Sequence, residues 1–180
     1  MNHLGTKKME TSRLILRPFI TEDAEPMYRN WASDPEVTKF LSWPAYRSVE
    51  NANYILDIWL PQYDDNTFYQ WAIELKDIGE PIGSMAVVNQ DDHIGKAEIG
   101  YCIGQSWWRQ GITSEALSAV IRFLMDEVGM QRIEARHDPR NLASGAVMRK
   151  CGMVFEGTMR RADRNNQGLC DASWYSIIKE

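Results

Sequence analysis

The sequence predicts a mixed α/β fold, and three observations lead to that class. Side chains alternate between polar and apolar over residues 68–75, the period-2 pattern of a half-buried strand. Apolar residues recur at helical spacing over 114–128, and Gly129 follows as a C-cap signal. Turn residues at 77–80 and 165–168 separate further strand candidates. Strands and helices therefore alternate along the chain in the order β-α-α-β-β-β-α-β-α-β-β.

The first half of the chain is expected to hold strands at 12–19, 68–75 and 82–88, the last two forming a hairpin. Thr21 is the candidate N-cap of a helix, with Asp23 favouring the positive end of its dipole. Asp34-Pro35 either ends this helix or separates it from a short second one. Ser48 is the candidate cap of the next helix, which we expect to stop at Pro61.

The second half is expected to hold strands at 96–104, 132–137, 153–161 and 170–178. The loop 105–113 leads from the first of these strands into the helix 114–128. Asn141 is the candidate N-cap of another helix, which runs to Cys151 and ends at Gly152. No repeat, low-complexity tract or linker interrupts the sequence, so we expect one domain over 1–180 with an ordered core over 9–180.

Composition places the chain among globular proteins. Its 180 residues are 44% hydrophobic, enough for a core, and the formal net charge of −5 disfavours a nucleic-acid binder. Cys102, Cys151 and Cys170 are widely spaced and form neither a disulfide framework nor a CxxC metal pair. The N-terminus lacks a signal-peptide pattern, and no apolar run approaches the ~18 residues of a membrane helix. We therefore expect a cytoplasmic protein without a metal, a membrane partner or a nucleic-acid partner.

Charge is unevenly distributed between the two halves. Residues 1–90 hold 8 Lys and Arg against 13 Asp and Glu, whereas residues 91–180 hold 12 of each. In the second half, 9 of the 12 basic residues are Arg. Because the guanidinium group suits phosphate, the second half is the better host for an anionic ligand.

The first segment that carries chemistry is 96–116, KAEIGYCIGQSWWRQGITSEA, in which a strand runs through a loop into a helix. A helix N-terminus presents unpaired N–H groups and a positive dipole end, so it binds phosphate without special side chains. Gly111 permits a positive φ or a close backbone approach, and Arg109 adds a cation. The alternative is an ordinary strand-to-helix turn. No GK[ST] is present, so this is not the loop of nucleoside-triphosphate enzymes.

The second such segment is 141–157, NLASGAVMRKCGMVFEG. Val147 and Cys151 continue a helical spacing that starts at Ser144, so Ser144 is expected to face the sheet. A capped amphipathic helix would explain Asn141 and Gly152, but it does not require Ser144.

These segments resemble the GNAT N-acetyltransferase superfamily and, within it, the RimJ/RimL-like branch of the ribosomal-protein alanine acetyltransferases. The stretches that carry the resemblance are ETSRLILRPFITEDAE, AEIGYCIGQSWWRQGITSEAL, NLASGAVMRKCGMVFEGTMR and DASWYSIIKE. The resemblance implies a twisted, mostly antiparallel mixed sheet of about seven strands flanked by about four helices. It also implies an acyltransferase that moves acetyl directly from acetyl-CoA to the primary amine of a peptide N-terminus or a small molecule.

The resemblance assigns the cofactor contacts mainly to backbone groups. The residues that it assigns to acetyl-CoA are Cys102, Ile103, Arg109, Gln110, Gly111, Ile112, Thr113, Ser114, Asn141, Ser144 and Lys150. The loop 109–114 would hold the pyrophosphate and Asn141 the pantetheine arm. Lys150 or Arg149 would approach the adenosine phosphates, with a solvated helix face as the alternative. Thr113 replaces the family's Gly or Ala and would narrow the loop.

Two residues are the catalytic candidates under this resemblance. Ser144 would lie near the sulfur and protonate the leaving thiolate, directly or through water. Glu98, on the strand that opens the acetyl site, is the candidate base, with an exposed strand residue as the alternative. A backbone N–H near Cys102 or Ile103 would hold the carbonyl oxygen as it gains charge. An α-amine needs the least help from a base, because roughly a tenth of it is neutral at pH 7.

Several alternatives stay open at this point. Trp31, Trp43 and Tyr46 form either an acceptor wall or part of the core, and Asp138 and Glu156 are weaker base candidates. A CoA-binding regulatory module of the same fold is the alternative function. A homodimer is compatible with the branch, and the acceptor amine is not defined.

Overall fold

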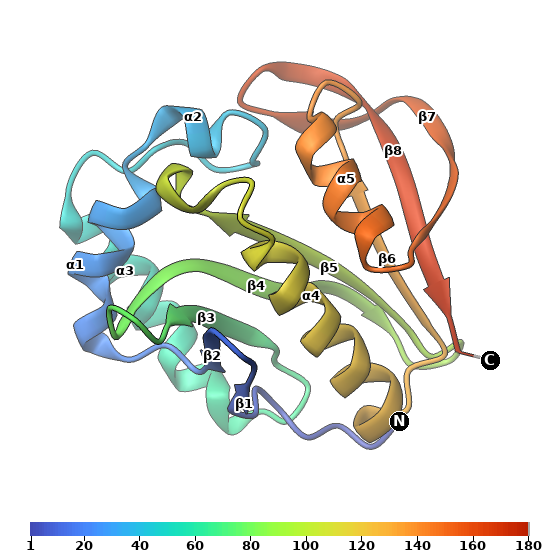
Figure 1. Ribbon diagram of the computed structural model, residues 1–180, viewed down its shortest axis with the longest axis horizontal. Helices are drawn as coiled ribbons and strands as arrows, with labels where there is room; N and C mark the ends of the chain where they lie inside the picture. The colour runs from blue at the N-terminus through green and yellow to red at the C-terminus, as the bar shows by residue number, and fades with distance from the viewer. Residues whose placement is uncertain (180) are drawn as a thin grey trace.

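The computed structural model describes residues 1–179 and contains an eight-stranded sheet in the order β1-β2-β3-β4-β5-β6-β8-β7 (Figure 1). Its strands are β1 (Met9–Glu10), β2 (Leu14–Arg17), β3 (Gln70–Leu75), β4 (Glu80–Asp91), β5 (Lys96–Ile103), β6 (Arg132–His137), β7 (Val154–Asn165) and β8 (Gly168–Ile178). Neighbouring strands are antiparallel except β5 and β6, which run parallel. The mixed sheet is as predicted. The additional strand is β1, whose two residues are too few to show an alternating pattern.

Five α-helices flank the sheet over residues 1–179: α1 (Ala24–Met27), α2 (Pro35–Thr38), α3 (Val49–Trp59), α4 (Ile112–Arg122) and α5 (Leu142–Lys150). A π-helical stretch, Phe123–Val128, continues α4. The short α2 is the additional helix that Asp34-Pro35 left open. In this part of the chain, no helix has both the length and the apolar character that a bilayer crossing needs.

Helices cover both faces of the sheet (Figure 1). α4 and α5 pack on one face, where the spacing predicted for 114–128 is confirmed by fully buried Ala116, Leu117, Val120 and Leu124. α1 and α3 pack on the other face in a second core that includes Cys102 of β5. Side chains alternate along a strand, so β5 supplies both cores.

The first helix begins differently from the prediction. Thr21 is not an N-cap but lies within a 3₁₀ turn, Thr21–Asp23, that follows Ile20. Asp23 is buried, and its carboxylate accepts from the Ile20 N–H at 2.9 Å and from the Arg17 guanidinium at 2.7 and 2.9 Å. A buried carboxylate needs such partners. Asp23 therefore lies in the first helical turn as predicted, and its carboxylate joins that turn to β2.

The boundaries of α3 also differ in detail. Ser48 precedes the helix as expected, but its hydroxyl makes no capping hydrogen bond within the described chain. The helix ends at Trp59, and Pro61 lies in the first turn of a 3₁₀ segment, Leu60–Asp64. Proline is tolerated there because a first-turn N–H has no partner to lose.

β5 and β6 are paired over only three residues. Pairing joins Lys96–Glu98 to Arg132–Glu134 and stops there. The following residues, 99–103 of β5 and 135–137 of β6, separate in front of the starts of α4 and α5. Peptide groups that face this separation need other partners. We call the space between 99–103 and 135–137 the β5–β6 gap; the predicted site residues Cys102 and Ile103 lie on its β5 side.

Candidate active site

The loop before α4 has the backbone of an anion site. Gly111 is left-handed with φ 75°, and Arg109 has φ 60°, so the chain turns sharply before α4 begins at Ile112. No side chain of the described chain caps this helix end. The first N–H groups of α4 therefore remain available to a ligand, at the positive end of the dipole.

Residues of this loop differ in what they can offer. Ile112 and Ser114 are 2% and 6% exposed, so they reach a ligand only through backbone groups. The Ser114 carbonyl also accepts from the Cys151 thiol at 3.3 Å, which joins α4 to α5. Gln110 is exposed and Thr113 is half-buried. The predicted use of backbone amides is thus consistent with the burial.

Two cationic side chains stand beside Gly111. A Cβ placed on Gly111 would lie 3.1 Å from Lys150 Nζ and 3.7 Å from an Arg13 guanidinium nitrogen. Arg13 donates to the Gln110 carbonyl at 2.9 Å and to the Glu115 carboxylate at 2.7 Å. A diphosphate fits this cradle, because glycine leaves the space open and cations line it.

The two basic residues at the end of α5 have different contacts. Lys150 points to the loop, whereas Arg149 donates to the Tyr175 hydroxyl at 2.8 Å. Arg13 was missed, because its contacts join residues about a hundred positions apart in the chain, and no local pattern reports such a contact.

A hydroxyl pair lies at the start of α5. Tyr101 Oη of β5 is 3.0 Å from Ser144 Oγ and donates to the Ser144 carbonyl at 3.1 Å. Burial raises the pKa of Tyr101 above its ordinary value, so its hydroxyl stays protonated. Asn141 caps α5 by accepting from the Ser144 N–H at 3.3 Å, which leaves its amide N–H₂ for a ligand. Ser144 faces the sheet as predicted.

The backbone N–H groups of Cys102 and Ile103, the two candidates to bind the carbonyl oxygen, point in opposite directions from β5. Gly104 donates its N–H to Ile82 of β4 at 2.9 Å. Because peptide directions alternate along an antiparallel strand, the N–H of Cys102 also faces β4, and that of Ile103 faces the β5–β6 gap. The Cys102 thiol is buried, its pKa is raised by that burial, and it packs on the face of α1 and α3. Cys102 is therefore a core thiol, and Ile103 is the better N–H donor.

Glu98 is not the exposed strand residue of the alternative interpretation. It is 4% exposed, lies where β5 and β6 part, and forms an ion pair with Arg136 of β6. Burial raises the pKa of Glu98, and the Arg136 charge opposes this. Arg136 also binds Asp163 of β7 at 2.8 Å and lies over the Trp174 ring. The carboxylate is thus buried, held in place and close to the gap.

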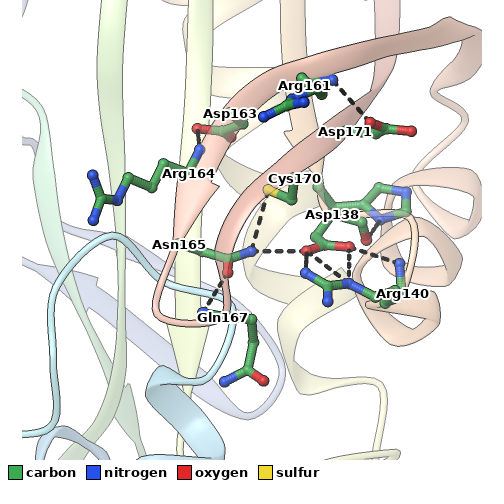
Figure 2. Close-up of polar contacts among 10 residues, drawn as sticks. Asp138, Arg140, Arg161, Asp163, Arg164, Asn165, Gln167, Cys170 and Asp171 are labelled. Carbon is green, nitrogen blue, oxygen red and sulfur yellow. Dashed lines mark hydrogen bonds and ion pairs between the residues drawn. The ribbon is translucent and has the colours of Figure 1, made fainter.

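The two weaker base candidates are unsuited to accept a proton. Asp138 is bound by the Arg140 guanidinium and by Asn165, as Figure 2 shows, and these hydrogen bonds hold its pKa well below the usual range. Arg132 and Ser176 lower the pKa of Glu156 to about 2. His137 packs against Tyr175, and burial lowers its pKa. All three are better explained by structural roles.

The aromatic candidates for an acceptor wall divide into two groups. Trp31 is 2% exposed and packs against Phe19, so it belongs to the core and offers no surface to a substrate. Trp43 and Tyr46 are half-buried neighbours with ring centres 5.2 Å apart. Burial and the Cys102 thiol raise the pKa of Tyr46 to about 12. Both Trp43 and Tyr46 pack against the second core, to which Cys102 of β5 belongs.

Within residues 1–179, no three His, Cys, Asp or Glu side chains are grouped so that they could hold a metal ion. The arrangement instead combines an anion cradle, a strand gap, a hydroxyl pair and a buried carboxylate. Together these suit transfer of a group from a phosphate-bearing carrier.

Comparison with known proteins gives the class. The family model described as acetyltransferase (GNAT) domain matches residues 13–154. An uncharacterized N-acetyltransferase of Bacillus subtilis, YoaA, is 33% identical over 95% of this chain and 96% of its own length. The chain therefore belongs to the GNAT acetyltransferase family, and it is an acyltransferase that moves acetyl from acetyl-CoA to an amine.

Two further proteins are similar in fold or in part of the sequence. The structure of RimL, described as a ribosomal L7/L12 alpha-N-protein acetyltransferase in complex with CoA, superimposes with a TM-score of 0.85. It is 22% identical and covers 96% of this chain and 98% of that one. The ribosomal protein uS5-alanine N-acetyltransferase of Escherichia coli is 39% identical over 59 residues, which is 33% of this chain and 30% of that protein.

Proposed function

We propose that the acceptor is an α-amine, carried by a peptide N-terminus or a small molecule, with Glu98 as base and Ser144 as acid. The observation that carries this proposal is the Glu98–Arg136 ion pair beside the gap. Even with its pKa raised by burial, a carboxylate remains far less basic than a lysine amine, whose pKa is about 10.4. An α-amine is already partly neutral at pH 7, so this base suffices for it.

Acid and base lie on opposite faces of β5. Glu98 shares its parity with Cys102, which packs on the α1 and α3 face, whereas Tyr101 binds Ser144 of α5 on the other face. An amine approaching one side of the acetyl carbon would therefore leave the departing sulfur on the other. This arrangement supports direct transfer, with no acyl group on the chain.

Each residue then has a defined task. Bound acetyl-CoA supplies an activated acetyl thioester. The cradle at Gly111 holds its diphosphate, and the amide of Asn141 holds the arm. The Ile103 N–H donates to the carbonyl oxygen. As the C–N bond forms and the C–S bond breaks, Glu98 takes one proton from the amine and the Ser144 hydroxyl passes one proton to the sulfur. Solvent water then takes the proton from Glu98 and returns one to Ser144, so neither side chain is changed by the turnover.

Two of the relatives are named for α-amine or alanine acceptors, which agrees with this proposal. The test compares a peptide with a free alanine N-terminus against an N-terminally blocked peptide with one lysine. At pH 7 we expect kcat/KM to favour the first by at least about 100-fold, the ratio of the neutral amine fractions. Equal or better use of lysine would refute the α-amine assignment. Binding of acetyl-CoA without turnover on any amine would instead favour the regulatory module.

A further inference from the structure

The turn between β7 and β8 is bonded to a distant loop. Asn166 donates its side-chain N–H₂ to the carbonyls of Thr38 and Trp43, both at 2.8 Å, and its backbone N–H to Leu41 at 3.1 Å. The side-chain bonds join residues 128 and 123 positions apart. In Figure 1 the end of the β7–β8 hairpin lies beside the segment that follows α2.

The same turn is fixed on its other side to the start of α5. Asn165 donates its amide to Asp138 at 2.9 Å and to the Cys170 sulfur at 3.4 Å, while its carbonyl oxygen accepts from the Gln167 N–H at 2.7 Å (Figure 2). The Asp138 carbonyl in turn accepts from the N–H of Asn141 at 2.7 Å. Two adjacent asparagines therefore face two different parts of the active site.

The bonded loop, residues 39–48, contains neither helix nor strand. It carries Trp43 and Tyr46, and the Tyr46 N–H donates to the Ala32 carbonyl at 2.8 Å. Further hydrogen bonds join Leu41 to Thr38 and the end of the loop at Arg47 to Asn51 and Tyr28. A segment without regular backbone bonds takes its position from such contacts. Arg140 adds a second link, because its guanidinium lies 6.0 Å from the Phe40 ring centre.

We propose that the Asn165–Asn166 pair is a clamp that sets the distance between the acceptor loop 39–48 and the thioester end of the site. Asn166 is then a positioning residue for the amine acceptor, and it acts through Trp43 and Tyr46. This inference rests on the proposed function, because it takes that loop as the acceptor wall. Acetyl-CoA contacts the cradle and α5, so its binding does not depend on Asn166.

Three variants test the clamp: Asn166→Ala, Asn166→Asp and the matched control Gln167→Ala. Asn166→Asp keeps the size but replaces the donor by an acceptor that faces two carbonyl oxygens. Gln167 is exposed on the same turn, and its backbone N–H survives the substitution. For both Asn166 variants we expect the KM of the amine to rise about tenfold, the loss of two hydrogen bonds, while the KM of acetyl-CoA stays within about twofold.

Amide hydrogen exchange gives a readout that needs no turnover. The 39–48 amides should exchange at least about tenfold faster in both Asn166 variants, with 141–150 and the Gln167→Ala control unchanged. A wild-type enzyme that acetylates no amine would refute the proposed function, while the exchange data would still judge the clamp. An amine KM and 39–48 exchange rates that stay at wild-type values in both Asn166 variants would overturn the clamp. Wild-type values in Asn166→Asp alone would overturn it too, because side-chain packing and not hydrogen bonding would then position the loop.

Discussion

The cofactor side and the acceptor side of this enzyme are built in different ways. The turn at Gly111 and the cap at Asn141 consist of backbone and helix-end groups within short stretches of chain, to which Lys150 and the distant Arg13 add cations. The acceptor loop 39–48 has no regular structure and is held by Asn166 from the other end of the sequence. Cofactor binding should therefore respond to backbone geometry, and acceptor use should respond to single side chains.

Loss of the Ser144 hydroxyl should have the largest effect and should separate chemistry from binding. In Ser144→Ala we expect kcat to fall about 100-fold, because a positioned proton donor contributes at least this much. The dissociation constant of acetyl-CoA, measured by calorimetry, should change less than about threefold. Ser144→Thr keeps the hydroxyl and is the control. A Ser144→Ala enzyme with wild-type kcat would exclude Ser144 as the proton donor to the sulfur.

A substitution at Gly111 should break the cofactor side alone. Gly111→Ala would place a methyl group 3.1 Å from Lys150 Nζ, inside the cradle. We expect acetyl-CoA affinity to fall about thirtyfold by calorimetry, or about 2 kcal/mol. Gly129→Ala is the matched control, because Gly129 also has a positive φ, at 90°, but its Cβ would meet nothing within 4 Å. Equal losses in both variants would assign the effect to backbone strain, about 1–2 kcal/mol.

Titration of the buried Glu98 carboxylate should shape the pH dependence of kcat/KM. Burial raises the pKa of Glu98, and a base acts when deprotonated. Once kcat/KM is divided by the neutral fraction of the amine, which itself changes with pH, it should still climb as pH rises through the raised pKa of Glu98. Glu98→Gln should lower kcat/KM about tenfold and remove this acid limb. Glu134→Gln is the control, since Glu134 is 6% exposed and also ion-paired. A Glu98→Gln profile that keeps the limb would exclude Glu98 as the base.

Removal of the Lys150 charge should have the smallest effect on acetyl-CoA binding, and its salt dependence should show that the contribution is electrostatic. Its side chain is exposed, so Lys150→Ala should weaken acetyl-CoA binding only about threefold at low salt. The difference should vanish near molar salt, where screening is nearly complete. Lys8→Ala, another exposed lysine, should show no difference at either salt concentration. A salt-independent loss for Lys150→Ala would point to packing.

The difference between the two sides also explains what the sequence could predict. Gly111 lies at the first turn of α4, and Asn141 and Ser144 lie at the first turn of α5. Each position depends on neighbours within one helix turn, so glycine, cap and spacing patterns in the sequence predict it. The helix 114–128 and the strand 132–137 were predicted for the same reason. β1 was not predicted because two residues form no pattern, and the predicted N-cap Thr21 is wrong because the turn begins one residue earlier, after Ile20.

Contacts between distant parts of the chain could not be predicted. Arg13 at the cradle, Arg136 on Glu98 and Asn166 on the acceptor loop each depend on which strands become neighbours. Trp31 shows the limit most plainly. A tryptophan side chain suits the wall of an acceptor site as well as a core, and only the packing with α1 and α3 shows that Trp31 is buried.

The most direct test of this account is hydrogen exchange of the wild-type protein with and without saturating acetyl-CoA. The account predicts protection at the amides of 109–115 and 141–145, with 39–48 unchanged. Protection confined to 39–48, or to the surface hollow of about 520 Å³ between Glu10 and Arg122, would contradict it, because the cofactor would then lie away from the cradle at Gly111.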